Sequence, residues 1–253
     1  MKNYLYLIAA VLLILPAHAQ LKAVEYKDGE HKLNGLAIAP KKALKDKPGI
    51  LILPAWKGID KHSKDAAQQL AALGYHAFVA DIYGEGSYPS NDKEAGERAG
   101  YYKKHYDEYF SRIRLAYDQL IKSGANPEEI VVIGYCFGGT GALEAARGNL
   151  KVKGVVSFHG GLAKDSARKT TVTTKILVCH GADDRYVPAE EITAFQNEMK
   201  ENKVDWQMIY YANSVHAFTD PEAGNDNSKG AAYNEKAAKR SWEHMLLFLK
   251  EVL

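Results

Sequence analysis

The sequence predicts an α/β fold in which a mainly parallel sheet is covered by helices on both faces. Short apolar segments alternate with helix-compatible segments along most of the 253 residues, and this alternation is typical of parallel strands joined by helical crossovers. An Asp28-Gly29 turn between two apolar runs near the amino end predicts an antiparallel hairpin. Polar residues follow several apolar runs directly, at the edge where a parallel sheet gathers its site-forming loops.

The first half of the chain supplies the hairpin and the first buried strands. We expect hairpin strands at 23–26 and 33–38, then strands at 50–54 and 76–80 and helices at 63–73 and 106–123. The fully apolar composition of 50–54 is typical of a buried parallel strand. Gly74 and Gly124 are suited to end the helices that precede them. Residues 87–100 show the least regular pattern, and we expect no regular element there.

The second half repeats strand and helix more regularly. We expect strands at 130–135, 152–158, 174–179 and 204–211, and helices at 139–147, 189–200 and 231–251. The strands are rich in β-branched and apolar residues, and the intervening segments have the spacing of amphipathic helices. No linker divides this part of the chain, which therefore predicts a single domain over residues 20–253.

The first nineteen residues are predicted to be a signal peptide. Lys2 gives a positive start, residues 5–15 form an uncharged apolar core, and Ala17-His18-Ala19 has the small-x-small pattern of a cleavage site. Cleavage before Gln20 would export the protein to the periplasm or to the medium. The apolar stretch is short for a membrane span, so no stable membrane association is expected after cleavage. A retained amino-terminal anchor is the alternative.

Composition excludes several classes of partner. The formal net charge of +2 gives no reason to expect nucleic acid or an anionic membrane. The sequence contains no HExxH, CxxC, P-loop or GxGxxG motif, so neither a metal nor another cofactor is expected. A disulfide between the two cysteines, Cys136 and Cys179, would consume the candidate nucleophile described next. Cys179 ends an apolar strand and is interpreted as a small buried residue.

Cys136 lies in the segment Gly134-Tyr135-Cys136-Phe137-Gly138-Gly139, between an apolar β-branched run and a helix-compatible segment. This is the strand–turn–helix context of a nucleophile elbow, Gly-x-Nuc-x-Gly, with sulfur in place of the more usual serine oxygen. Side chains at positions 134 and 138 would collide with neighbouring backbone in so tight a turn. The alternative is a packed core cysteine.

Two further residues follow later strands in the order nucleophile, acid, histidine, which is the chain order of α/β-hydrolases. Asp184 follows the apolar run 176–179, and His216 follows the strand-like segment 206–211. Asp183 is the main alternative to Asp184 as the acid. Asp184 could instead be the N-cap of a helix. A turn histidine is the alternative for His216.

The three residues suggest thiol chemistry. His216 would accept the proton of Cys136 and remain beside the thiolate as imidazolium, and Asp184 would hold the ring in the correct tautomer. The dipole of the following helix would also lower the thiol pKa. The backbone N–H groups of Phe137 and Trp56 are the candidate oxyanion-hole donors.

Other polar residues at strand ends receive weaker assignments. We interpret His159 as pocket wall and His180 as structural. The tyrosine-rich stretch 101–106 could line the substrate entrance or form an exposed amphipathic helix, and the sequence leaves both open.

These motifs resemble the dienelactone hydrolase family of α/β-hydrolases. The matching segments are Gly134–Gly139, Ala80–Gly84, Asp184–Pro188 and His216–Phe218, and the likeness covers roughly residue 33 to the end. The resemblance implies the α/β-hydrolase fold, a Cys136–His216–Asp184 triad, a thioester acyl-enzyme and no cofactor. It also implies hydrolysis of small-molecule esters or lactones, with Tyr83, His159, Phe218 and Arg98 at the substrate pocket.

The sequence departs from the family pattern at two positions. Ala55 stands where well-known members place a glutamate that interacts with the resting cysteine, and Asp220 stands where they place an arginine that binds the substrate carboxylate. Ester or lactone hydrolysis is therefore expected without a commitment to dienelactone. The alternatives are a thioesterase or peptidase-like hydrolase on the same site, or a non-catalytic binding protein with a hydrolase fold.

Overall fold

The computed structural model describes residues 20–165 and 167–253, so the predicted signal peptide lies outside the described residues. Eight strands form a sheet in the order β1-β2-β4-β3-β5-β6-β7-β8. The strands are β1 (Lys22–Asp28), β2 (His31–Ile38), β3 (Gly49–Leu53), β4 (His76–Val79), β5 (Ile130–Tyr135), β6 (Gly154–Phe158), β7 (Lys175–Gly181) and β8 (Trp206–Tyr211). The helices are α1 (Lys61–Ala72), α2 (Asp92–Lys104), α3 (Tyr106–Lys122), α4 (Phe137–Arg147), α5 (Ala189–Glu201) and α6 (Glu235–Val252).

The pairing of the strands confirms the predicted mainly parallel sheet with an antiparallel hairpin. β1 pairs with β2 antiparallel, from Lys22 opposite Ala37 to Asp28 opposite His31, and β2 pairs antiparallel with β4. Every other neighbouring pair is parallel. The carboxyl ends of β3 and of β5 to β8 therefore reach one edge, where the loops that follow them can meet.

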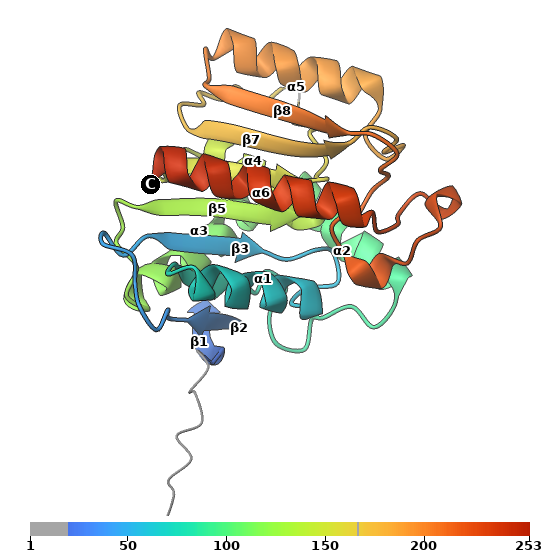
Figure 1. Ribbon diagram of the computed structural model, residues 1–253. Coiled ribbons are helices and arrows are strands. Elements are labelled where there is room, and N and C mark those ends of the chain that lie inside the picture. Colours follow the sequence, from blue (N-terminus) through green and yellow to red (C-terminus); the bar gives the residue numbers. More distant parts are fainter. Residues whose placement is uncertain (1–19, 166) are drawn as a thin grey trace, which may run out of the picture.

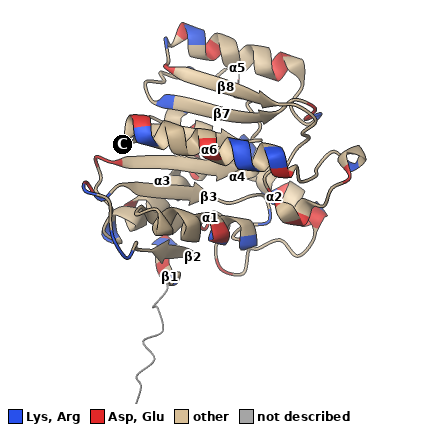
Figure 2. Cartoon of the chain, viewed as in Figure 1, with Lys and Arg blue, Asp and Glu red and all other residues tan. Residues whose placement is uncertain are grey.

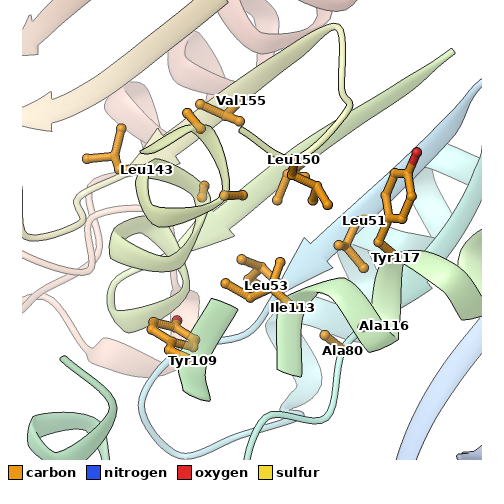
Figure 3. Close-up of a cluster of buried hydrophobic side chains, with 14 of the residues drawn as sticks. Leu51, Leu53, Ala80, Tyr109, Ile113, Ala116, Tyr117, Leu143, Leu150 and Val155 are labelled. Atoms are coloured by element: carbon orange, nitrogen blue, oxygen red, sulfur yellow. The ribbon is translucent and has the colours of Figure 1, made fainter. Parts of the chain in front are cut away.

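Helices cover both faces of this sheet, and each face has its own apolar core. Figure 1 shows α1 and α6 across the near face, with α3 and α4 behind the strands. The near core joins Leu70 of α1 and Met245 of α6 to the strands. In the far core, Figure 3 shows Tyr109 and Ile113 of α3 beside Leu53 of β3. Burial of such large side chains contributes about 1.5–3 kcal/mol each.

Charged residues occur mainly in helices and loops, while the central strands β3 and β5 contain none (Figure 2). Arg147 of α4 carries a buried charge, because its side chain is only 1% exposed. Its guanidinium donates to Glu198 of α5 at 2.7 Å and to Glu144 at 2.9 Å. It also donates to the carbonyl oxygens of Leu162 and Ala163. These bonds join α4 to α5 and to the segment after β6.

The expectation of no regular element at 87–100 is wrong, because α2 begins at Asp92. The Asn91 side chain accepts the Glu94 backbone N–H at 3.0 Å, and the Glu94 carboxylate accepts the Ser90 N–H at 2.9 Å. This reciprocal capping starts the helix. Its buried residues Ala95, Ala99 and Tyr102 have helical spacing, whereas Gly96 and Gly100 weaken the sequence pattern.

The last helix was expected from residue 231, but α6 begins at Glu235. The Asn234 side chain caps it by accepting the Ala237 N–H. The connection before it contains two 3-10 turns, Pro221–Ala223 and Asn227–Lys229. Within residues 20–165 and 167–253, no helix combines the length and hydrophobicity needed to cross a membrane.

Candidate active site

Cys136 lies at the turn between β5 and α4, and the turn is as tight as the glycine pattern predicts. The Cys136 backbone has φ 54° and ψ −115°, a strained combination for a residue with a side chain. A Cβ atom on Gly134 would lie 1.9 Å from the carbonyl oxygen of Gly138, and one on Gly138 would lie 2.1 Å from that of Leu53. The backbone therefore leaves no space for a side chain at either position.

The structure brings His216 and Asp184 to this cysteine. His216 Nε2 lies 2.9 Å from Cys136 Sγ, and His216 Nδ1 lies 2.8 Å from Asp184 Oδ2. The Asp184 side chain is fully buried, and its second oxygen accepts the Tyr186 N–H at 2.9 Å. Asp183 is exposed, and its backbone N–H donates to the carbonyl oxygen of Ser214. Asp184 is thus the carboxylate that contacts the histidine.

The electrostatics of the pair favour a thiolate beside an imidazolium. Burial raises the pKa of the Cys136 thiol, but His216, Lys103 and the Phe137 backbone N–H together lower it below its ordinary value. Burial lowers the pKa of His216, and the Cys136 sulfur and Asp184 outweigh that effect and raise it. Each group therefore stabilises the charge on the other.

Cys136 and His216 open onto a cavity of about 430 Å³. Aromatic walls come from Trp56, Tyr135 and Tyr186, and the charged lining includes Lys103 and Asp220. The remaining lining residues are Ala55, His62, His159, Gly161, Ala217 and Ala231. Within the described part of the chain, no three His, Cys, Asp or Glu side chains are grouped so that they could hold a metal ion.

Of the four predicted pocket residues, only His159 lines this cavity. Tyr83, Arg98 and Phe218 do not line it, so their place at the substrate pocket stays a prediction. Tyr83 and Arg98 line another cavity. The Tyr83 ring stacks on Phe137, and its hydroxyl donates to the Trp56 carbonyl oxygen at 2.7 Å. Phe218 is 0% exposed and packs in the core against Tyr211.

The candidate oxyanion-hole residues flank the sulfur. Phe137 is the first residue of α4, which begins two residues earlier than expected, and its N–H is among the groups that lower the Cys136 pKa. Trp56 lines the cavity in a turn closed by the Gly58 N–H on the Ala55 carbonyl oxygen. The start of α4 packs directly on the backbone of residues 53–54, which places this turn beside the elbow.

Cys179, His180 and His159 are all buried. Cys179 is fully buried and free, and burial raises its thiol pKa to about 12. His180 is buried near the end of β7, and its Nδ1 atom has no hydrogen-bond partner among the residues that the structure describes. His159 is buried too, but it contacts the Cys136 backbone, which a pocket-wall assignment does not anticipate.

Sequence reasoning missed several residues of the cavity. Lys103 belongs to the tyrosine-rich stretch 101–106, for which the sequence predicts no individual role. In the structure it lines the cavity from α2. His62 comes from α1 and Tyr186 from the segment after β7. The capping pattern at Asn91 and Glu94 was the signal that could have revealed α2, and with it Lys103.

Comparison with known proteins agrees with the family that the sequence motifs indicate. The model of the dienelactone hydrolase family matches residues 33–253. A crystal structure of a dienelactone hydrolase-like promiscuous phosphotriesterase from metagenomic libraries superposes with a TM-score of 0.87 and 32% identity, covering 93% of this chain and 99% of that one. An uncharacterized protein of Caenorhabditis elegans is 34% identical over 127 residues, 49% of this chain and 80% of the relative. A probable 2-oxo-3-(5-oxofuran-2-ylidene)propanoate lactonase of Bradyrhizobium is 25% identical over 80% of this chain and 83% of the relative. These likenesses confirm the predicted α/β-hydrolase fold.

Proposed function

The chain belongs to the dienelactone hydrolase family, and from this membership we propose that it hydrolyses ester or lactone bonds of small molecules with Cys136 as nucleophile. The observation that carries the proposal is the contact of His216 with both Cys136 Sγ and Asp184. A sulfur that is only packed in a core needs no imidazole at 2.9 Å and no cavity in front of it.

The reaction divides between the three side chains. The Cys136 thiolate attacks the carbonyl carbon, and the N–H groups of Phe137 and Trp56 stabilise the negative oxygen. His216 donates its proton to the leaving alkoxide, which leaves a thioester on the sulfur. The neutral His216 then takes a proton from water, whose oxygen attacks the thioester carbon. The thiolate is released, and the acid product leaves. Asp184 holds the His216 ring throughout.

Substitution of each cysteine tests the nucleophile. Cys136→Ala should reduce hydrolysis of p-nitrophenyl acetate to the background rate, while Cys179→Ala keeps most of it, because Cys179 lies away from the cavity. Equal loss in the two variants, with unchanged melting temperatures, would contradict the assignment. A panel of a γ-lactone, an acyl thioester and a peptide anilide then compares lactonase, thioesterase and peptidase activity.

A phosphotriester is a second candidate substrate. The structural neighbour described as a promiscuous phosphotriesterase is 32% identical over nearly the whole chain, which supports including a p-nitrophenyl phosphotriester in the panel. Turnover that Cys136→Ala abolishes would assign this activity to the same sulfur.

We also propose that the protein is exported. The support is the pattern of Lys2, the apolar stretch 5–15 and Ala17-His18-Ala19. Mass spectrometry of the protein from the periplasm or medium should give an amino terminus at Gln20. A chain that retains residues 1–19 would contradict the cleavage.

A further inference from the structure

His159 holds an unusual position directly behind the nucleophile. It directly follows β6, the strand next to β5, the residue is 2% exposed, and its backbone lies at φ 40°. The Cys136 backbone N–H donates to His159 Nδ1 at 3.2 Å and also to the Phe158 carbonyl oxygen at 3.0 Å. Two residues with positive φ, each directly after one of two adjacent strands, are therefore bonded to each other.

The bonding partners determine the tautomer of His159. Because the Cys136 N–H donates to Nδ1, that nitrogen carries no proton. The proton of the neutral ring then lies on Nε2, which is 2.7 Å from Thr219 Oγ1. Thr219 Oγ1 lies 3.1 Å from His62 Nε2, so the hydroxyl can donate to His62. The chain of bonds runs from the elbow through His159 and Thr219 to His62.

The surroundings keep His159 neutral. Its ring lies 5.3 Å from that of His216, which carries positive charge beside the thiolate. Burial, followed by His216 and His62, lowers the pKa of His159 well below its ordinary value. A protonated Nδ1 would face the Cys136 N–H with a second hydrogen, and the bond to the elbow would be lost.

We propose that His159, in its neutral Nε2–H form, is a positioning residue that holds the strained Cys136 backbone so that Sγ faces His216. Thr219 fixes the ring by accepting the Nε2 proton. This inference rests on Cys136 being the nucleophile, as proposed above. His159 itself forms no bond with the substrate in this role, so its loss should lower kcat more than it raises KM.

Two substitutions that each replace one ring nitrogen by an amide group test the roles of Nδ1 and Nε2 separately. Asn places its amide oxygen near the position of Nδ1, and Gln places its amide group near that of Nε2. We expect His159→Asn to keep kcat for p-nitrophenyl acetate within about twofold, and His159→Gln to lose about fivefold, the effect of one hydrogen bond. Equal losses, or no loss in either variant, would overturn the proposal.

Alkylation of Cys136 by iodoacetamide gives a readout that needs no substrate. The pH at which the alkylation rate reaches half its maximum should move upward in His159→Gln and stay in place in His159→Asn, with mass spectrometry assigning the label. If the wild-type protein hydrolyses no ester, the proposed function fails, while the alkylation comparison still tests the positioning role. His180→Gln is the matched control, a buried strand-end histidine whose change should leave both measurements as in wild type.

Thr219 offers an independent pair in case the His159 variants do not fold. Thr219→Val removes the acceptor of the Nε2 proton, and Thr219→Ser keeps it. We expect a lower kcat and a shifted alkylation profile in the valine variant only. A valine variant that matches the serine variant in both measurements would overturn the proposal.

Discussion

At the scale of single residues, the proposed function makes the Cys136–His216 pair the determinant of the pH range of activity. The reactive ion pair exists in the pH range above the pKa of Cys136 and below the pKa of His216. Burial raises the pKa of Cys136, but His216 lowers it further, whereas the Cys136 sulfur and Asp184 raise the pKa of His216 against the effect of burial. Alkylation of Cys136 should therefore already be fast below the ordinary pKa of a thiol. The ion pair is lost at acid pH when Cys136 gains a proton, and at alkaline pH when His216 loses one.

Asp184→Asn should narrow this range from its alkaline side. Without the carboxylate the pKa of His216 falls, so the alkaline limit of kcat/KM moves to lower pH. The maximum should fall on the order of 100-fold, because the ring also loses its orientation. Asp183→Asn is the control, since Asp183 is exposed. A pH–rate profile that shifts equally in both variants would contradict the role of Asp184.

Lys103 acts on the same sulfur through its charge. It lines the cavity from α2 and is among the groups that lower the pKa of Cys136, after His216. Lys103→Met should move the alkylation profile of Cys136 to higher pH, whereas Lys104→Met should not. Both lysines are exposed on the same helix, so a general change in surface charge would move the two profiles alike and would disprove a specific role.

At the scale of elements, the junction of β5 with α4 depends on two close backbone approaches. Gly138→Ala would place a Cβ atom 2.1 Å from the Leu53 carbonyl oxygen, and backbone cannot move aside as a flexible side chain can. We expect a loss of about 2–4 kcal/mol in the free energy of unfolding, measured by urea denaturation, together with loss of activity.

Gly100→Ala in α2 provides the contrast for this substitution. A Cβ atom there has no neighbour within 4 Å, so the change should stabilise the helix by about 0.5–1 kcal/mol and keep activity. If both alanine variants were equally stable, crowding at the elbow would not be the reason for Gly138.

At the scale of the whole molecule, the buried Arg147 joins α4, α5 and the segment after β6. Arg147→Met should lower the free energy of unfolding by about 3–5 kcal/mol, because Glu198 would be left buried without a cation and Glu144 would keep only Arg168. Lys151→Met breaks an exposed ion pair with Glu128 and should cost less than about 1 kcal/mol. Similar urea midpoints for the two variants would contradict this difference.

The architecture could be predicted from the sequence because its signals are local. Glycines around Cys136 and apolar runs that end before Asp184 and His216 are readable within a few residues. The parallel sheet then places those run ends at one edge, so the sequence alone predicts that three residues far apart in the chain lie together.

The rest of the cavity depends on packing that no local pattern records. Arg98 and Lys103 lie on the same helix, but only Lys103 lines the cavity with Cys136. Phe218, two residues after His216, is buried in the core. The contact of His159 with the Cys136 backbone joins two residues that follow adjacent strands and are 23 positions apart, so no local pattern predicts it.

The amino-terminal hairpin reaches the catalytic loop through hydrogen bonds. The Asn34 N–H of β2 donates to the Asp81 carboxylate, which also accepts the Tyr83 N–H, and the Tyr83 hydroxyl donates to the Trp56 carbonyl oxygen. The hairpin lies at the far side of the sheet order from β8, so shortening the chain from this side would leave most of the sheet paired. Such a shortening would remove this support of the Trp56 turn together with the buried side chains of Tyr26 and Leu33.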